Sequence, residues 1–228
     1  LDRGAAVWPL SWLVLMVVRA LPNAPGHDGL RLFLPSIASL AVLAGIGAGC
    51  LIDALRSRRL RWLAIGLPLL AVAECLLGIV QLYPYTLSYY NHAIGGLRGA
   101  ERWGFELTYY WDTAGPEFLN WVRSQAEQRP VELRFPSDLI NIRFLREWGE
   151  LPQHVPIVGL ENTQRPYYVL QRRRGLYYPY DWWLDQHGTP SMKISRQGVD
   201  LLRVYAFEEA FRAYEATRDV PIPEYLRQ

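Results

Sequence analysis

Two runs of 21 residues, almost free of charge, constrain this chain more than any other feature of its sequence. Leu32–Ile52 contains no charged side chain, and Trp62–Leu82 contains one, Glu74. A helix of about 20 apolar residues crosses the roughly 30 Å of hydrocarbon in a bilayer. The two runs therefore predict transmembrane helices at about 32–53 and 62–82.

A shorter apolar stretch precedes them. Gly4–Val18 is 15 residues long and ends at Arg19, whose long side chain can extend to the membrane surface. The hydrophobic core of a signal peptide is the competing interpretation. We favour a span at about 4–20, because the chain begins with Leu1 and residues 21–25 do not form a small-residue cleavage site. We expect this helix to belong to a larger protein that begins upstream.

Charge separates an apolar part from a polar part. Residues 1–90 carry 11 charged side chains, whereas residues 91–228 carry 17 basic and 18 acidic ones. With 50% hydrophobic residues and two cysteines, the chain is neither a disordered protein nor a disulfide scaffold. The polar part has a net charge of −1, which argues against a nucleic-acid partner. We predict a membrane portion of about three helices (1–83), a juxtamembrane segment (84–112) and a small soluble α/β domain of mixed α+β type (113–228).

An arginine-rich hairpin predicts the orientation. Residues 56–61 read RSRRLR, and positive loops face the cytoplasm. We therefore expect a multi-pass inner or plasma membrane protein with the hairpin 56–61 in the cytoplasm. The loop 21–31 and residues 84–228 are then extracytoplasmic. Four tyrosines directly after the last span predict an interfacial aromatic belt: Tyr83, Tyr85, Tyr89 and Tyr90.

Three features of the spans bear on packing and function. Cys50 and Cys75 differ in predicted depth by about 12 Å, too far for a disulfide, so we expect free thiols. Gly45 and Gly49 are spaced to let another helix approach closely. Glu74 is a candidate functional carboxylate within the membrane, and a hydrogen-bonded packing residue is the favoured alternative.

The juxtamembrane segment is rich in glycine between Asn91 and Ala100. Because no strand precedes it and no Lys-Ser/Thr follows, it is not a phosphate-binding loop. We interpret it as a tight turn. The domain then alternates predicted helices and strands: a helix at about 115–127, a strand at 131–135, a helix over 139–145 capped by Ser137 or Asp138, strands at 155–158 and 167–171, a hairpin of 192–194 and 199–206, and a closing helix at 206–217.

Catalytic motifs are scarce. The four histidines have no metal-ligand spacing, so neither a metal site nor a cofactor is expected. Arg172-Arg173-Arg174 can grip a phosphate or lipid headgroup, although a solvated strand end is the favoured interpretation. The aromatic run around Asp181-Trp182-Trp183 can stack on a sugar, or can equally form domain core or an interfacial anchor.

Two groups of residues resemble a known family. The first is HDGLRLFLP at 27–35, and the second runs from PYTLSYYN at 84–91 through Gly95-Gly96, Gly99-Ala100, Gly104-Phe105-Glu106 and Tyr110-Trp111. Together they resemble bacterial polytopic glycosyltransferases of the protein-mannosyltransferase and aminoarabinose-transferase type, which have the GT-C architecture. The resemblance covers roughly residues 21–112, and the rest of the chain corresponds only to a variable soluble tail.

The resemblance implies an enzyme that moves a sugar from a polyprenyl-phosphate carrier to an extracytoplasmic acceptor. Its catalytic Asp lies in the first outer loop, which we expect upstream of Leu1, so no residue here inherits that role. By position, His27, Asp28 and Arg31 are candidates for binding the lipid phosphate, and an interfacial cap on the span is the alternative. Weaker candidates are Glu74, Asn91, His92, Glu106 and Trp111. The expected partners are the bilayer, the donor lipid and the missing N-terminal helices. A non-enzymatic, membrane-anchored binding domain is the second hypothesis.

Overall fold

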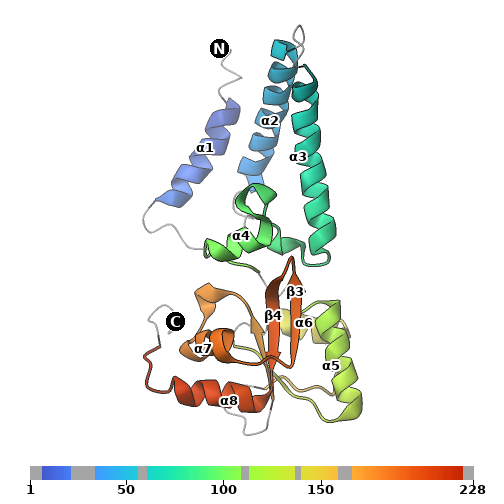
Figure 1. Cartoon of the computed structure of the whole chain (residues 1–228), viewed down its shortest axis with the longest axis vertical. Helices are drawn as coiled ribbons and strands as arrows, with labels where there is room; N and C mark the ends of the chain where they lie inside the picture. Colours follow the sequence, from blue (N-terminus) through green and yellow to red (C-terminus); the bar gives the residue numbers. More distant parts are fainter. Residues whose placement is uncertain are drawn as a thin grey trace. The chain divides into compact units, whose positions relative to one another are not determined.

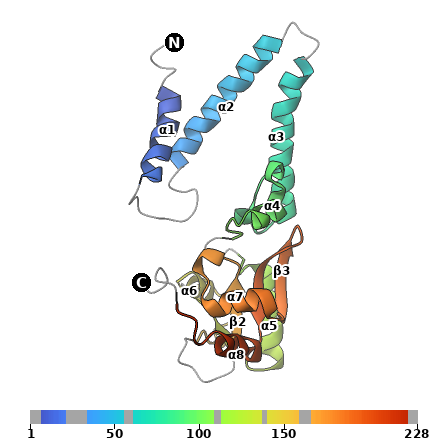
Figure 2. The same cartoon turned by 60° about the vertical axis from the view of Figure 1, so that its left-hand side comes forward.

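The computed structural model describes residues 7–21, 34–55, 61–108, 113–136, 140–158 and 166–222 (Figures 1 and 2). The chain forms two compact units, Leu1–Leu76 and Leu77–Gln228. The first unit is made of helices. The second contains the last six residues of the third helix together with a mixed α/β domain built on a four-stranded sheet.

The described residues of the first unit form three helices: α1 (Val7–Ala20), α2 (Leu34–Leu55) and α3 (Arg61–Leu82), which continues into the second unit. α1 packs against α2, and Ser36 Oγ donates a hydrogen bond to the Trp12 carbonyl at 3.3 Å. Ser36–Leu55 in α2 and Ile65–Leu82 in α3 are long and apolar enough to cross a membrane, and most of their side chains are exposed. Two of the predicted spans thus form helices of the required length. α1 has 14 residues and is about 21 Å long, so a third span stays a prediction.

The small residues and thiols of these helices are also exposed. Cys50 and Cys75 are free thiols, as the depth argument predicted. A Cβ atom placed at Gly45, Gly47 or Gly49 meets nothing within 4 Å. The close helix approach predicted at Gly45 and Gly49 is therefore not made by the residues described.

The second unit is organised around a sheet with strand order β1-β2-β4-β3. β1 (Leu133–Arg134) and β2 (Tyr167–Gln171) are parallel, whereas β4 (Val199–Tyr205) is antiparallel to β2 and to β3 (Met192–Arg196). β3 and β4 form a hairpin whose turn contains Gln197, at φ +49°, and Gly198, at φ +75°. These bounds match the predicted strand at 167–171 and the predicted hairpin. The strand predicted at 155–158 is reduced to one bridge, between Leu133 and Ile157.

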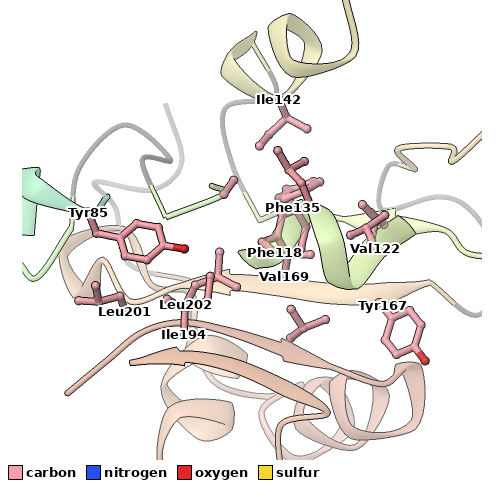
Figure 3. Packing of buried hydrophobic residues seen from close by; sticks show 14 of the residues in the cluster. Tyr85, Phe118, Val122, Phe135, Ile142, Tyr167, Val169, Ile194, Leu201 and Leu202 are labelled. Atoms are coloured by element: carbon pink, nitrogen blue, oxygen red, sulfur yellow. The ribbon is translucent and has the colours of Figure 1, made fainter. Parts of the chain in front are cut away.

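Both faces of the sheet are buried. The alternation along β2 sends Tyr167 and Val169 to one face and Tyr168 and Leu170 to the other, because successive side chains point to opposite sides. The first face packs against α5 (Pro116–Gln128) and α6 (Ile140–Glu147), as Figure 3 shows. The second packs against α7 (Pro179–His187) and α8 (Phe207–Ala216). The helices predicted at 115–127, 139–145 and 206–217 are confirmed. α7 was not predicted, and Ser137 and Asp138 lie outside the described residues.

The glycine-rich segment contains more than a turn. Two short 3₁₀ helices, η2 (Thr86–Ser88) and η3 (His92–Ile94), lead into α4 (Gly96–Arg102). Gly95, at φ +92°, makes the turn that we predicted, and its conformation favours glycine. Gly99 is required for a different reason: a Cβ atom there would lie 1.7 Å from the Ile94 carbonyl oxygen. α4 itself was missed, because glycine has a low helix propensity.

The predicted aromatic belt is largely wrong. Tyr85 is 0% exposed and belongs to the domain core, and Tyr89 and Tyr90 are partly buried against that core. Only Tyr83, which is 72% exposed, is available to an interface. Tertiary contacts within the second unit therefore withdraw three of the four tyrosines from the surface.

Candidate functional site

The three strongest sequence candidates, His27, Asp28 and Arg31, lie outside the described residues, as does the weaker candidate Trp111. Glu74 is partly buried on α3, and the Sγ of Cys75 lies 3.7 Å from its Oε2. This contact is with the next residue in the chain, so both interpretations of Glu74 stay predictions.

Two juxtamembrane candidates have structural partners. The Asn91 side chain accepts a hydrogen bond from the Ile94 N–H at 3.3 Å and so caps η3. Glu106 Oε1 accepts from the Gly175 N–H at 2.7 Å, and the Glu106 carbonyl accepts from the Tyr90 hydroxyl at 2.6 Å. The side chains of Asn91 and Glu106 thus hold the nearby backbone in place through hydrogen bonds to its N–H groups. His92, beside Asn91, is exposed.

The end of α3 is joined to the domain through one side chain at the tip of the β3–β4 hairpin. Gln197 Nε2 donates to Gln81 Oε1 at 2.8 Å, and its Oε1 accepts from the Leu97 N–H at 2.9 Å. Its carbonyl accepts from Arg98 Nε at 2.6 Å. Gln197 thus connects the last turn of α3, the first turn of α4 and the sheet. Leu82, which is 0% exposed, continues α3 into the domain core.

A buried ion-pair network lies next to this junction. Arg172 follows β2 directly and is 5% exposed. Its guanidinium holds Asp185 of α7 in two hydrogen bonds of 2.7 and 3.2 Å, and holds Glu101 of α4 at 2.8 Å. Burial lowers the pKa of Arg172, but its hydrogen bonds to Asp185 and Glu101 and its charge attraction to Asp185 outweigh this and raise the pKa above its ordinary value. Arg172 is therefore permanently charged.

Further charges extend the network across the sheet. Arg203 of β4 contacts Asp185 at 3.0 Å and Asp200 at 2.8 Å, and Arg174 reaches Asp185 at 3.5 Å. The favoured interpretation of the arginine triplet as a solvated strand end is wrong for Arg172. The signal in the sequence was the predicted strand at 167–171, which Arg172 directly continues; the structure shows that this strand is buried, and a buried arginine needs an acidic partner. Because its donors already face carboxylates, Arg172 fastens α4 and α7 to the sheet and is not free to grip a phosphate.

A second buried carboxyl lies at the start of α7. Asp181 is 0% exposed, and it accepts hydrogen bonds from the Tyr168 hydroxyl at 2.5 Å and the Tyr178 N–H at 2.9 Å. Burial raises the pKa of Asp181 to about 7, although the two hydrogen bonds and the charge of Arg134 act in the opposite direction. Burial and the neighbouring Asp181 also raise the pKa of Tyr168 well above its ordinary value. An acid that titrates near neutrality is a common catalytic feature. Asp181, however, is closed off from solvent, so its titration affects the stability of the domain.

The aromatic run around Asp181 divides between core and surface. Tyr177 is 2% exposed and packs edge-on against Trp182, at 5.2 Å between ring centroids. Tyr178 and Tyr180 stack in parallel at 5.4 Å, and Trp182 is 39% exposed with Arg174 at 6.0 Å from its ring. Tyr177 thus belongs to the core, whereas the exposed part of Trp182 can contact a ligand.

Two hollows among the described residues of the domain lie elsewhere. One, of about 500 Å³, is lined by residues 126–132 with His154 and Pro156, and another, of about 290 Å³, shares residues 129–132. Neither is lined by a residue that the sequence singled out. Among the residues with a described structure, no three His, Cys, Asp or Glu side chains lie close enough together to hold a metal ion.

Comparisons with protein-family models, with curated proteins and with solved structures found no match to this chain. The site that the described residues do establish is a junction at which α3, α4 and the sheet are held together by Gln197 and by the Arg172 network.

Proposed function

We propose that this chain is the C-terminal portion of a membrane glycosyltransferase, which moves a sugar from a polyprenyl-phosphate donor to an extracytoplasmic acceptor. The observation that carries the proposal is the fusion of a span-length apolar helix with an α/β domain: α3 ends in the domain core, and Gln81 is bonded to the hairpin tip. The domain is thereby held close to the end of the span. A lipid-linked sugar presents its phosphate at the same level of the membrane. The motifs at 27–35 and 84–111 support the same function.

The chemistry is a displacement at the anomeric carbon of the sugar. A carboxylate upstream of Leu1 removes the proton from the acceptor hydroxyl, and the polyprenyl phosphate leaves with the bonding electrons. Basic groups stabilise the charge that develops on the leaving phosphate. Arg31 has this role in our proposal, with His27 and Asp28 beside it in the same outer loop. The orientation follows the arginine-rich hairpin, with residues 56–61 in the cytoplasm and residues 84–228 outside.

Transfer by the full-length protein in proteoliposomes tests the function. With a radiolabelled polyprenyl-phosphate sugar, we expect Arg31→Ala to lower the rate of transfer about 10²-fold, as does the loss of one group that stabilises developing charge. Asp28→Ala is expected to lower it as well. Arg143→Ala is the matched control, because Arg143 is an exposed arginine on α6. Unchanged transfer in both loop variants would refute the role of this loop in transfer. If the unmodified protein transfers no sugar from any lipid-linked donor, the proposed glycosyltransferase function is refuted.

The exposed ring of Trp182 favours one alternative, a membrane-anchored domain that binds envelope glycan without catalysis. Trp182 and the stacked pair Tyr178–Tyr180 present aromatic faces of the kind that stack on sugars. Calorimetric titration of the full-length protein with envelope oligosaccharides distinguishes this function. Under this alternative, Trp182→Ala abolishes binding. Trp148→Ala is the control and does not abolish it, although Trp148 is 72% exposed and Trp182 only 39%. Equal binding by both variants excludes a role for Trp182.

A further inference from the structure

A group of exposed side chains surrounds α4, between the end of α3 and residue 105. Its aromatic and apolar members are Tyr83, Leu87, Trp103 and Phe105, which are 72, 52, 76 and 50% exposed. Its basic members, Arg98 and Arg102, are also exposed, whereas Leu97, Gly99 and Ala100 of the same helix are buried. α4 therefore packs against the domain through Leu97, Gly99 and Ala100 and presents its two arginines outward. The exposed rings of Trp103 and Phe105 follow directly after it. These six exposed residues are called the juxtamembrane platform.

Contacts within the second unit fix the level of the platform along α3. The Tyr89 ring lies against α3 at Gly78, where a Cβ atom would approach Tyr89 Cε2 to 2.2 Å. Gly78 precedes the end of α3 by four residues, about 6 Å along the helix axis. Tyr90 stacks on Phe105, with 5.9 Å between their ring centroids. Phe105 is thereby held at the level of the last turns of α3, and Figures 1 and 2 both show α4 beside the C-terminal end of this helix.

We propose that the juxtamembrane platform lies in the interface of the bilayer that α3 spans, with Trp103 and Phe105 among the headgroups and Arg98 and Arg102 bound to anionic lipid phosphates. Large aromatic rings and arginines are the side chains that favour this zone, because each combines an apolar body with a polar or charged end. An anionic membrane surface also attracts each nearby basic residue. The continuity of the platform with α3 and its positive charge identify the lipid surface as the occupant.

The charge of Arg102 is available for this contact. The Arg98 guanidinium uses one N–H for the Gln197 carbonyl, whereas the Arg102 guanidinium bonds to none of the residues described. Glu101, between the two arginines, is neutralised by Arg172. The exposed charge of α4 is therefore positive. Tyr85, Tyr89 and Tyr90, which the sequence predicted at the membrane interface, pack against the domain, and in our proposal the platform lies at the interface instead.

The inference rests on the proposed membrane insertion of α3, so the test measures both. Single nitroxide labels replace Leu70, Trp103, Phe105 and Trp148 in the full-length, cysteine-free protein, reconstituted in phosphatidylcholine vesicles with and without phosphatidylglycerol. Collision rates with oxygen and with a water-soluble nickel complex give the depth of each label. We expect label 70 in hydrocarbon, labels 103 and 105 at headgroup depth, and label 148 in water.

Other label depths would refute either the membrane insertion of α3 or the position of the platform. Label 70 in water would refute insertion and the platform together, whereas label 70 in hydrocarbon with labels 103 and 105 in water would refute the platform alone. Labels 103 and 105 shielded from both reagents would show that protein, and not lipid, covers this surface. For the charge, we expect Arg102→Glu to lower the headgroup-level population of label 105 about fivefold in phosphatidylglycerol vesicles and not in phosphatidylcholine. Arg143→Glu is the matched control, and an equal effect of both variants would refute the role of Arg102.

Discussion

Removal of the Arg172 guanidinium tests the junction most directly. Arg172→Ala removes the guanidinium that bonds both to Asp185, whose side chain is 5% exposed, and to Glu101. Breaking a buried ion pair in this way costs about 3–5 kcal/mol. Arg203 and Arg174 still face Asp185 at 3.0 and 3.5 Å, so the lower end of this range, about 3 kcal/mol, is the expected loss of domain stability.

Hydrogen–deuterium exchange of the amides in β2 and β4 measures this loss in the full-length protein in detergent. A loss of about 3 kcal/mol accelerates exchange through unfolding about 150-fold, since 1.36 kcal/mol corresponds to a factor of ten. Arg123→Ala is the matched control, because Arg123 and its partner Glu150 are 42 and 56% exposed. An exposed pair contributes about 0–1 kcal/mol. If Arg172→Ala accelerates exchange no more than Arg123→Ala does, the network does not hold the domain together.

Three further predictions concern pH, packing and topology. Burial raises the pKa of Asp181 from 3.8 to about 7, so its contribution to stability is fully present below the unfolded pKa and is lost as the pH rises through about 7. Asp181→Asn should remove this part of the slope from thermal unfolding curves recorded between pH 4 and 7.5, and an unchanged slope would contradict the assignment. Gly99→Ala should destabilise the domain in amide exchange, because its Cβ meets backbone at 1.7 Å, whereas Gly45→Ala, with nothing within 4 Å, should not; equal effects would show that α4 tolerates the methyl group. Single cysteines at Ser57 and His187, in a chain without Cys50 and Cys75, should react with an impermeant thiol reagent in intact cells at 187 and not at 57, and the reverse pattern would invert the proposed topology.

Local patterns in the sequence predicted much of the fold. The two apolar runs predicted the helices at 34–55 and 61–82, because span length follows from the rise per residue alone. The strand at 167–171 and the hairpin around Gln197-Gly198 followed from apolar runs and turn residues. These features depend on neighbours in the chain. The three-span count, the orientation and the enzyme stay predictions.

The candidate site depended on contacts between distant residues, and the sequence predicted little of it. Arg172 meets a carboxylate 71 positions away in α4, and α4 lies in a segment that its glycines marked as a turn. Asp181 of α7 is buried and accepts a hydrogen bond from Tyr168 of β2. No local rule gives such pairs, because the packing of helices against the sheet decides which side chains meet.

The tyrosines after α3 show the difference between what the sequence determines and what depends on tertiary contacts. The sequence alone determined that apolar stretches of span length are followed by several aromatic residues. Only the tertiary structure decided that Tyr85 enters the core while Trp103 and Phe105, some 20 residues later, remain at the surface. The physical reason is that hydrophobic burial acts on whichever side chains the fold brings to the core, and their distance along the sequence from the membrane helix does not enter.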